Sequence, residues 1–211
     1  MTYLIMVLIT VVAYFLGSVN SAIIVGKLHK IDIREHGSGN AGLTNTLRVL
    51  GKSSAVCVLL GDVLKAVIAI GIAKIVTLGF NDELLINLTL QLAGIAVVLG
   101  HIFPIYYGFK GGKGVLTSIS VMFMINWEIS LICLLLFIVV VAITKFVSLG
   151  SILAAFVFPI LVLFSGKIPF LTNRIDMLVF AIILAAIVII KHRSNIVRLV
   201  QGKENKLSFK K

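Results

Sequence analysis

Residues 4–25 read LIMVLITVVAYFLGSVNSAIIV and contain no charged side chain. A helix needs about 20 consecutive apolar residues to cross the hydrocarbon core of a bilayer, and this stretch provides them. A secretory signal would have basic residues before a shorter apolar core and a small-residue cleavage site after it. No Lys or Arg precedes residue 4, so we interpret the stretch as a retained membrane helix.

Apolar runs of the same kind recur along the rest of the chain. They cover residues 54–78, 84–99, 115–125, 129–143, 149–164 and 177–190. The fourth, fifth and seventh of the resulting seven runs are short for a span and must include flanking residues. We therefore expect an all-α integral membrane protein, a bundle of seven transmembrane helices in a single domain over residues 1–211. Six spans, with the fourth and fifth runs forming one broken unit, is the alternative.

The composition agrees with a surface that faces lipid. Of the 211 residues, 60% are hydrophobic and 13% are charged, whereas soluble domains are about 45–50% apolar and about 25% charged. The cysteines, Cys57 and Cys133, both lie in apolar runs and are interpreted as small hydrophobic residues. The four histidines show no zinc-ligand spacing, so we expect no metal, no cofactor and an activity that survives a chelator.

The net charge of +11 is distributed unevenly between the loops. With seven spans and the N-terminus outside, fifteen basic residues fall on the inside: Lys27, Lys30, Arg34, Arg48, Lys52, Lys110, Lys113, Lys145, Lys191, Arg193, Arg198, Lys203, Lys206, Lys210 and Lys211. Only Lys167 and Arg174 fall outside, and Lys65 and Lys74 lie within the second run. This asymmetry predicts a cytoplasmic C-terminus and cytoplasmic polar loops. The basic residues are therefore expected to contact anionic lipid. No basic helix or aromatic-spaced basic patch points to nucleic acid.

The first inside loop is rich in glycine and neutral hydrogen-bonding residues. It contains Gly37, Ser38, Gly39, Asn40, Ala41, Gly42, Leu43, Thr44 and Asn45, followed by Arg48 and Gly51. Glycines allow a backbone to turn its amides towards an anion, and the planar fork of an arginine suits phosphate or carboxylate. We interpret the loop as an anion site; a flexible loop with helix caps is the alternative.

A second glycine-rich block follows the third apolar run. It contains Gly100, His101, Ile102, Phe103 and Pro104, and then Phe109, Lys110, Gly111, Gly112, Lys113, Gly114 and Val115. Free amides and the helix dipole make such a loop before a helix an anion site, to which Lys113 adds a charge. It is not a nucleotide P-loop, because Tyr107 stands where the first Gly of that motif belongs. We infer a small phosphate group; a glycine-rich turn with a basic anchor is the alternative.

Polar groups also follow the last apolar run and interrupt the second. His192 and Asn195 are three residues apart and share a face if the helix continues; Glu204 lies further on. The alternative is a basic helix end that serves only orientation. In the second run, Asp62 and Lys65 are also three apart, which predicts either a structural ion pair or an Asp62 that orients loop groups.

Together these blocks resemble the bacterial acyl-phosphate-dependent glycerol-3-phosphate acyltransferase family. The resemblance rests on residues 37–51, 100–115 and 191–204, with a further match at residues 61–65. It implies seven helices with the N-terminus outside, in the bacterial cell (inner) membrane, with the active site facing the cytoplasm. It also implies transfer of an acyl chain from acyl phosphate to the 1-hydroxyl of glycerol 3-phosphate, giving lysophosphatidic acid and inorganic phosphate for phospholipid synthesis. We expect the monomer to be functional.

The resemblance and the residue chemistry together give the expected site. The predicted catalytic residues are Ser38, Arg48, Lys113, His192 and Asn195. The predicted substrate-binding residues are Gly37, Gly39, Asn40, Gly42, Thr44, Asn45, His101, Gly111, Gly112, Gly114 and Glu204. Acyl phosphate is already activated, so no enzyme nucleophile is needed, and no Gly-x-Ser-x-Gly elbow is present. The proton acceptor is His192 or a substrate phosphate; His192 could instead bind a phosphate.

Three other functions are compared with this one. A phosphate or organic-anion transporter would have its site near the bilayer midplane and often two inverted halves. An acyltransferase that uses thioesters would carry Asp five residues after a His, and none of the four histidines has it. A structural scaffold would not need Ser38, Asn40, Arg48 and Lys113 together. Uptake of labelled anion into vesicles without chemical conversion would favour the transporter.

Overall fold

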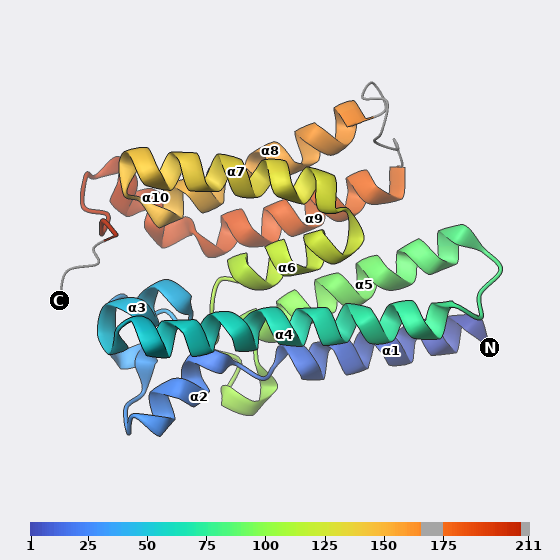
Figure 1. Cartoon of the computed structure of the whole chain (residues 1–211), viewed down its shortest axis with the longest axis horizontal. Helices are drawn as coiled ribbons and strands as arrows, with labels where there is room; N and C mark the ends of the chain where they lie inside the picture. Colours follow the sequence, from blue (N-terminus) through green and yellow to red (C-terminus); the bar gives the residue numbers. More distant parts are fainter. Residues whose placement is uncertain (166–174, 208–211) are drawn as a thin grey trace. The chain divides into compact units, whose positions relative to one another are not determined.

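The computed structural model describes residues 1–165 and 175–207, and within them every regular element is a helix (Figure 1). The predicted outside residues Lys167 and Arg174, and Lys210 and Lys211 of the tail, lie outside the described residues. The helices form two units, residues 1–125 and residues 126–210, and each is described by itself.

The first unit is built around three long helices. Its elements are α1 (Thr2–Gly17), α2 (Ser21–Leu28), η1 (Ile33–Glu35), α3 (Leu43–Leu50), α4 (Lys52–Thr77), α5 (Glu83–Ile102), η2 (Ile105–Tyr107) and α6 (Val115–Ile125). Helix α1 packs along α5, and α4 packs against α1, α5 and α6. Two glycines allow α1 and α5 to approach closely: a Cβ built on Gly17 would lie 2.2 Å from Val97 O, and one on Gly100 would lie 2.2 Å from Tyr14 O.

The first apolar run is two helices, where the sequence predicted one. Residues 18–20 separate α1 from α2, and the buried side chain of Asn20 caps α2 by accepting a hydrogen bond from Ile23 N at 3.1 Å. A cap residue takes an extended backbone and ends the helical path before it, which explains the break. Residues 2–28 still satisfy the length and apolarity of one membrane span.

The second unit consists of four helices. They are α7 (Trp127–Thr144), α8 (Val147–Phe164), α9 (Ile175–Lys191) and α10 (Arg193–Val200). Asn126 caps α7 through a 2.9 Å hydrogen bond to Ile129 N, and Lys145 turns the chain between α7 and α8 with φ 63°. Helix α8 packs against α7 and α9. Between α9 and α10 the axis bends by 59° at His192.

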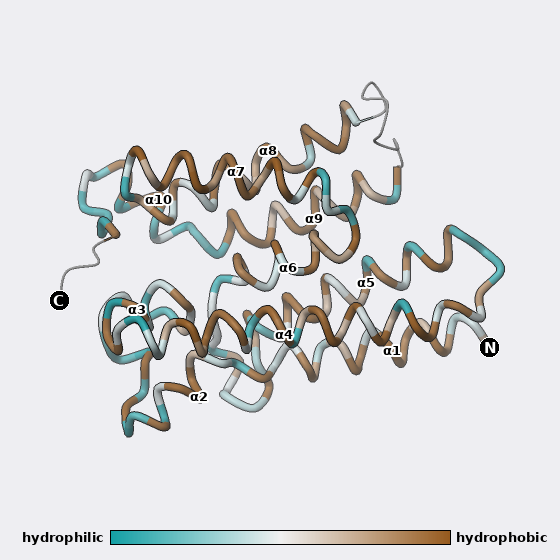
Figure 2. The backbone as a smooth tube through the Cα atoms, viewed as in Figure 1, coloured by the Kyte–Doolittle hydropathy of each residue, from teal (hydrophilic) through white to brown (hydrophobic). Residues whose placement is uncertain are grey.

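All seven predicted apolar runs are helical, but they differ in length. Among the described residues, five elements are long and apolar enough to cross a membrane, and the bent pair of α9 and α10 makes a sixth. Helix α6 has only 11 residues. The described part of the chain is therefore all-helical, with five or six segments suited to cross a membrane, and the count of seven stays a prediction. Figure 2 shows brown, apolar residues along the long helices and teal, polar residues at helix ends and in loops.

Within the first unit, most basic residues gather at one end of the helix axes. The N-terminus and the acidic turn between α4 and α5 lie at one end, and α2 and α3 lie at the other (Figure 1). The basic residues of α2, α3 and their connecting loop are therefore remote from Asp82 and Glu83. This separation agrees with the predicted orientation, which itself stays a prediction.

Candidate functional site

The first glycine-rich loop is held in shape by Asn45. This side chain is buried at the start of α3; its Oδ1 accepts from Ser38 N at 2.8 Å, and its Nδ2 donates to Ile33 O at 3.1 Å and His36 O at 3.0 Å. Gly37 has φ +62°, and a Cβ there would lie 2.4 Å from Asn45 Oδ1, so only glycine fits. The structure thus gives Asn45 a bracing role, and its predicted contact with substrate stays a prediction.

The same loop leaves its predicted catalytic groups accessible. Ser38 is exposed between Gly37 and Gly39, both with positive φ. Arg48 is exposed on α3, and among residues 1–165 and 175–207 it has no ion-pair partner. An unpaired guanidinium beside a glycine-rich turn is suited to bind a phosphate. The remaining predicted binding residues of this loop, Asn40, Gly42 and Thr44, are half-buried or buried around the start of α3.

The second glycine-rich loop folds back onto the end of α5. Gly111 N donates to Ile102 O at 3.1 Å and Gly112 N donates to His101 O at 3.2 Å. A Cβ built on Gly112 would lie 2.2 Å from His101 Nε2 and 2.5 Å from Ala41 O, while one on Gly111 would lie 2.1 Å from His101 O. Gly112 therefore fits between α5 and Ala41 of the first loop. The two predicted anion-binding loops meet at this point.

Helix α6 begins directly after this loop. Gly114 has φ +80°, a conformation that favours glycine, and α6 starts at the next residue. Lys113 is half-buried beside it. Thr117 and Ser118 are buried in the first turn, and within the described part of the chain their hydroxyls have no hydrogen-bond partner. Positive charge, a helix N-terminus and unused donors are thus gathered beside the glycine-rich turn.

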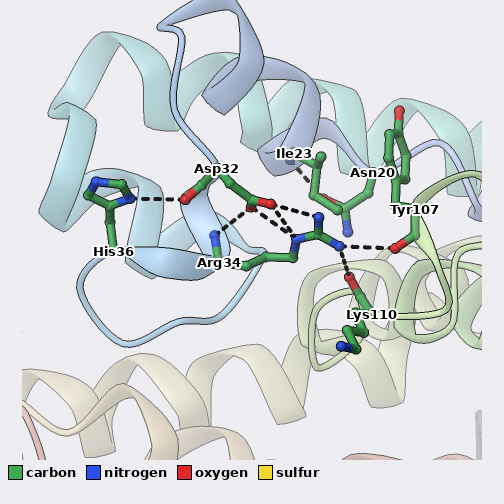
Figure 3. A network of polar contacts seen from close by, with 7 residues as sticks. All are labelled: Asn20, Ile23, Asp32, Arg34, His36, Tyr107 and Lys110. Carbon is green, nitrogen blue, oxygen red and sulfur yellow. Dashed lines mark hydrogen bonds and ion pairs between the residues drawn. The ribbon is translucent and has the colours of Figure 1, made fainter.

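Arg34, which sequence reasoning missed as a structural residue, joins the two loops through hydrogen bonds to backbone carbonyls (Figure 3). Arg34 Nη1 donates to Tyr107 O at 3.0 Å and to Lys110 O at 3.2 Å. Its Nε and Nη2 pair with the Asp32 carboxylate at 2.9 Å and 2.7 Å. From the sequence, Arg34 was interpreted only as a basic residue of an inside loop. The spacing of Asp32 and Arg34 could have indicated their ion pair, but it carries no information on a partner more than seventy residues away. Arg34 ties the first loop to the segment that carries the second.

Breaking this bridge should loosen the loops and change how stability depends on pH. The hydrogen bond from Arg34 lowers the pKa of the Asp32 carboxyl from 3.8 to about 2. Such a carboxyl contributes stability above its unfolded pKa and loses it as the pH falls towards the folded value. We expect the Tm of the wild type in detergent to fall between about pH 4 and pH 2, and Arg34→Gln to have a lower Tm at pH 7 and a shallower fall in that window.

Lys30→Gln serves as the control, because it removes an exposed charge from the same loop and leaves the Asp32–Arg34 ion pair intact. Identical pH profiles for Arg34→Gln and the wild type would contradict the prediction.

The second unit carries the other predicted site residues at its helix bend. His192 is buried, and its Nδ1 lies 2.8 Å from Val188 O. A carbonyl only accepts, so Nδ1 carries a proton. Asn195 Nδ2 donates to Glu204 Oε1 at 2.8 Å, and Arg198 Nε donates to Glu204 Oε2 at 2.9 Å. Glu204 therefore fixes which way the Asn195 amide points.

Glu204→Gln should weaken both hydrogen bonds, because a neutral amide is a poorer acceptor than a carboxylate. We expect kcat/KM to fall by about tenfold, the usual cost of losing a partner that orients a functional side chain. Steady-state kinetics of the purified variant would measure it, with the neighbouring exposed Lys203→Gln as control. Equal losses in both variants would show that the tail is sensitive to substitution in general.

The predicted site residues therefore fall into two groups. Ser38, Arg48 and the residues around Gly112 and Lys113 belong to the first unit, and His192, Asn195 and Glu204 belong to the second. In the first unit the two loops that carry these residues meet at Ala41 and Gly112, and in the second unit Asn195 contacts Glu204. That the two groups act on one substrate stays a prediction. In residues 1–165 and 175–207 there is no cluster of three His, Cys, Asp or Glu side chains that could hold a metal ion.

The sequence matches a known family along nearly its whole length. The sequence model of the family described as glycerol-3-phosphate acyltransferase matches residues 7–202. A glycerol-3-phosphate acyltransferase of Clostridioides difficile (strain 630) is 46% identical over 207 residues, covering 97% of both chains. One of Shouchella clausii (strain KSM-K16) is 47% identical over 198 residues, covering 93% of both.

The fold also matches solved structures. The crystal structure of PlsY (YgiH), an integral membrane glycerol 3-phosphate acyltransferase, in its glycerol 3-phosphate form has a TM-score of 0.83 and 35% identity, covering 96% of both chains. Its lysophosphatidic acid form has a TM-score of 0.80 and covers 97% of this chain and 96% of that one. The chain described here is an acyltransferase that belongs to the glycerol-3-phosphate acyltransferase family.

Proposed function

We propose that this protein transfers a fatty acyl group from acyl phosphate to the 1-hydroxyl of glycerol 3-phosphate, giving lysophosphatidic acid and inorganic phosphate. The observation that supports it most is the meeting of the two glycine-rich loops at Gly112 and Ala41. Both substrates carry phosphate, and both loops have the backbone and charge to bind it. We assign glycerol 3-phosphate to residues 111–114 of the second loop, as the family resemblance implies. The PlsY structures in glycerol 3-phosphate and lysophosphatidic acid forms support the substrate and the product.

In the proposed reaction the hydroxyl oxygen attacks the acyl carbonyl carbon. A new ester bond forms, the bond between that carbon and the phosphate oxygen breaks, and phosphate leaves with the electron pair. Lys113, Arg48 and the amides of the loops bind the phosphates, so the catalytic gain comes from orientation and charge stabilisation. Orientation of two reactants provides about 7–11 kcal/mol, and each donor aimed at the developing oxyanion provides about 3–4 kcal/mol.

The hydroxyl proton goes to His192 in this proposal. Because Nδ1 donates to Val188 O, the neutral ring has its lone pair on Nε2, which is the form that a general base requires. Asn195 directs its Nδ2 to Glu204, so the orientation of its amide is fixed before substrate binds. Ser38 orients the carbonyl. The acyl chain lies along the apolar helices, seven of which span the bacterial cell membrane with the site facing the cytoplasm.

An assay with purified protein tests the proposal. Acyl phosphate and labelled glycerol 3-phosphate should give lysophosphatidic acid and inorganic phosphate in equal amounts, whereas acyl-CoA in place of acyl phosphate should give no product. Product from acyl-CoA alone would overturn the donor, and labelled glycerol 3-phosphate that stays unacylated with both donors would overturn the reaction.

A further inference from the structure

A buried ion pair lies on α4 in the first unit. Asp62 and Lys65 are one helical turn apart, their side chains are 1% and 6% exposed, and Lys65 Nζ lies 2.9 Å from Asp62 Oδ1. Ser21 Oγ, at the start of α2, donates to the same carboxylate oxygen at 2.9 Å. Gly61 allows this approach, because a Cβ there would lie 2.6 Å from Ser21 Oγ. The carboxylate is thus fixed by two helices.

The ammonium group of Lys65 reaches beyond Asp62. Its Nζ lies 3.0 Å from Val19 O and 2.9 Å from His101 Nδ1. With Asp62 these atoms make three acceptors for the three protons of an ammonium group. His101 Nδ1 is therefore an acceptor, and the neutral ring carries its proton on Nε2. One negative charge, one positive charge and one neutral ring give the cluster no net charge, as a buried site requires.

The opposite edge of the His101 ring faces the glycine-rich loop. The Cβ position of Gly112 lies 2.2 Å from His101 Nε2, so the ring and the loop are packed without space for a methyl group. The His101 carbonyl also accepts from Gly112 N at 3.2 Å. The ring that Lys65 holds on one side therefore supports, on the other, the backbone that carries Gly111 to Gly114.

Helix association alone does not explain this arrangement. A buried ion pair contributes little net stability, and apolar residues of similar size often serve as well. Ionisable side chains in membrane spans are costly and are usually retained for function. Here the ion pair does what apolar residues could not do, because it fixes the tautomer and the orientation of the His101 ring.

We propose that Asp62 and Lys65 are positioning residues for acyl transfer. By directing one ammonium proton at His101 Nδ1, they fix the ring that supports residues 111–114 in the conformation that binds glycerol 3-phosphate. The inference rests on the proposed function of this loop, and it assigns Lys65 no contact with substrate.

The test compares two variants with a matched control. Lys65→Met removes the hydrogen bond to His101 but leaves Asp62 without its cation. Asp62→Leu with Lys65→Met replaces the pair by apolar residues, which a membrane span tolerates. Lys74→Met removes an exposed lysine from the same helix. For each protein we would measure the Tm in detergent, the KM for each substrate, kcat, and binding of glycerol 3-phosphate without acyl donor.

We expect the double variant to fold with a Tm close to that of the wild type, yet to show a KM for glycerol 3-phosphate raised by about tenfold or more. Its KM for acyl phosphate should change by less than about twofold, because only the glycerol 3-phosphate loop has lost its support. Lys65→Met should show the same defect where it folds, and Lys74→Met should match the wild type.

A double variant that folds and has the wild-type KM for glycerol 3-phosphate would overturn the inference, as would equal increases in both KM values. Failure of the wild type itself to bind and acylate glycerol 3-phosphate would instead overturn the proposed function. If the double variant does not fold, Lys65→Arg is compared with Lys65→Met. Lys65→Arg keeps the hydrogen-bond donor and should restore the KM for glycerol 3-phosphate that Lys65→Met raises. A KM that is not restored would refute the positioning role.

Discussion

Gly112→Ala should lower kcat/KM for glycerol 3-phosphate by about 100-fold, the loss expected when a bound group shifts by about 1 Å. The added Cβ would lie 2.2 Å from His101 Nε2 and 2.5 Å from Ala41 O. One of these contacts is a backbone carbonyl, so the loop and not a side chain must move. That movement separates the two glycine-rich loops at the point where they meet.

Gly71→Ala provides the matched control for this substitution. Gly71 lies within α4, and a Cβ there would meet no atom within 4 Å. Its kinetics should equal those of the wild type, and alanine favours the helix over glycine. Steady-state kinetics with glycerol 3-phosphate as the varied substrate distinguish the two. Wild-type kinetics in Gly112→Ala would show that contact between the loops is not needed for turnover.

Lys113→Ala is expected to reduce turnover by about 10²–10³-fold, the usual loss when one charged or donor group is removed from a developing anion. Lys113 immediately precedes Gly114 and α6, so its ammonium adds a full charge to the free amides of the helix N-terminus. Lys113→Arg should retain part of the activity, because it keeps the charge but replaces a compact ammonium by a planar fork.

The control for Lys113 is Lys52→Ala, an exposed lysine at the start of α4. It removes the same charge from the first unit, so a purely electrostatic attraction of substrates would affect both variants alike. The measurement is kcat and KM for both substrates, with Tm in detergent to confirm folding. Full activity in Lys113→Ala would refute the phosphate-binding role of the second loop.

Local sequence determined most of the helices. An apolar run forms a helix in lipid because no water is available for its backbone groups, and all seven predicted runs are helical. Local sequence also determined the glycine-rich loops, because Gly37, Gly39 and Gly114 have positive φ, a conformation that glycine adopts readily. Helix breaks were less predictable: the Asn20 cap that separates α1 from α2 interrupts a run that is otherwise apolar.

Tertiary structure alone decided which polar groups brace the protein. Asn45 could as well have been a ligand from its sequence, but its amide is used on the loop backbone. Lys65 and His101 are 36 positions apart, and Arg34 and Tyr107 are 73 apart. Composition and spacing report on neighbours along one chain segment, whereas a hydrogen bond depends on where the fold places its donor and acceptor. The sequence therefore determined the helices, the glycine turns and the chemistry available, and the packing of α2, α4 and α5 determined how that chemistry is held.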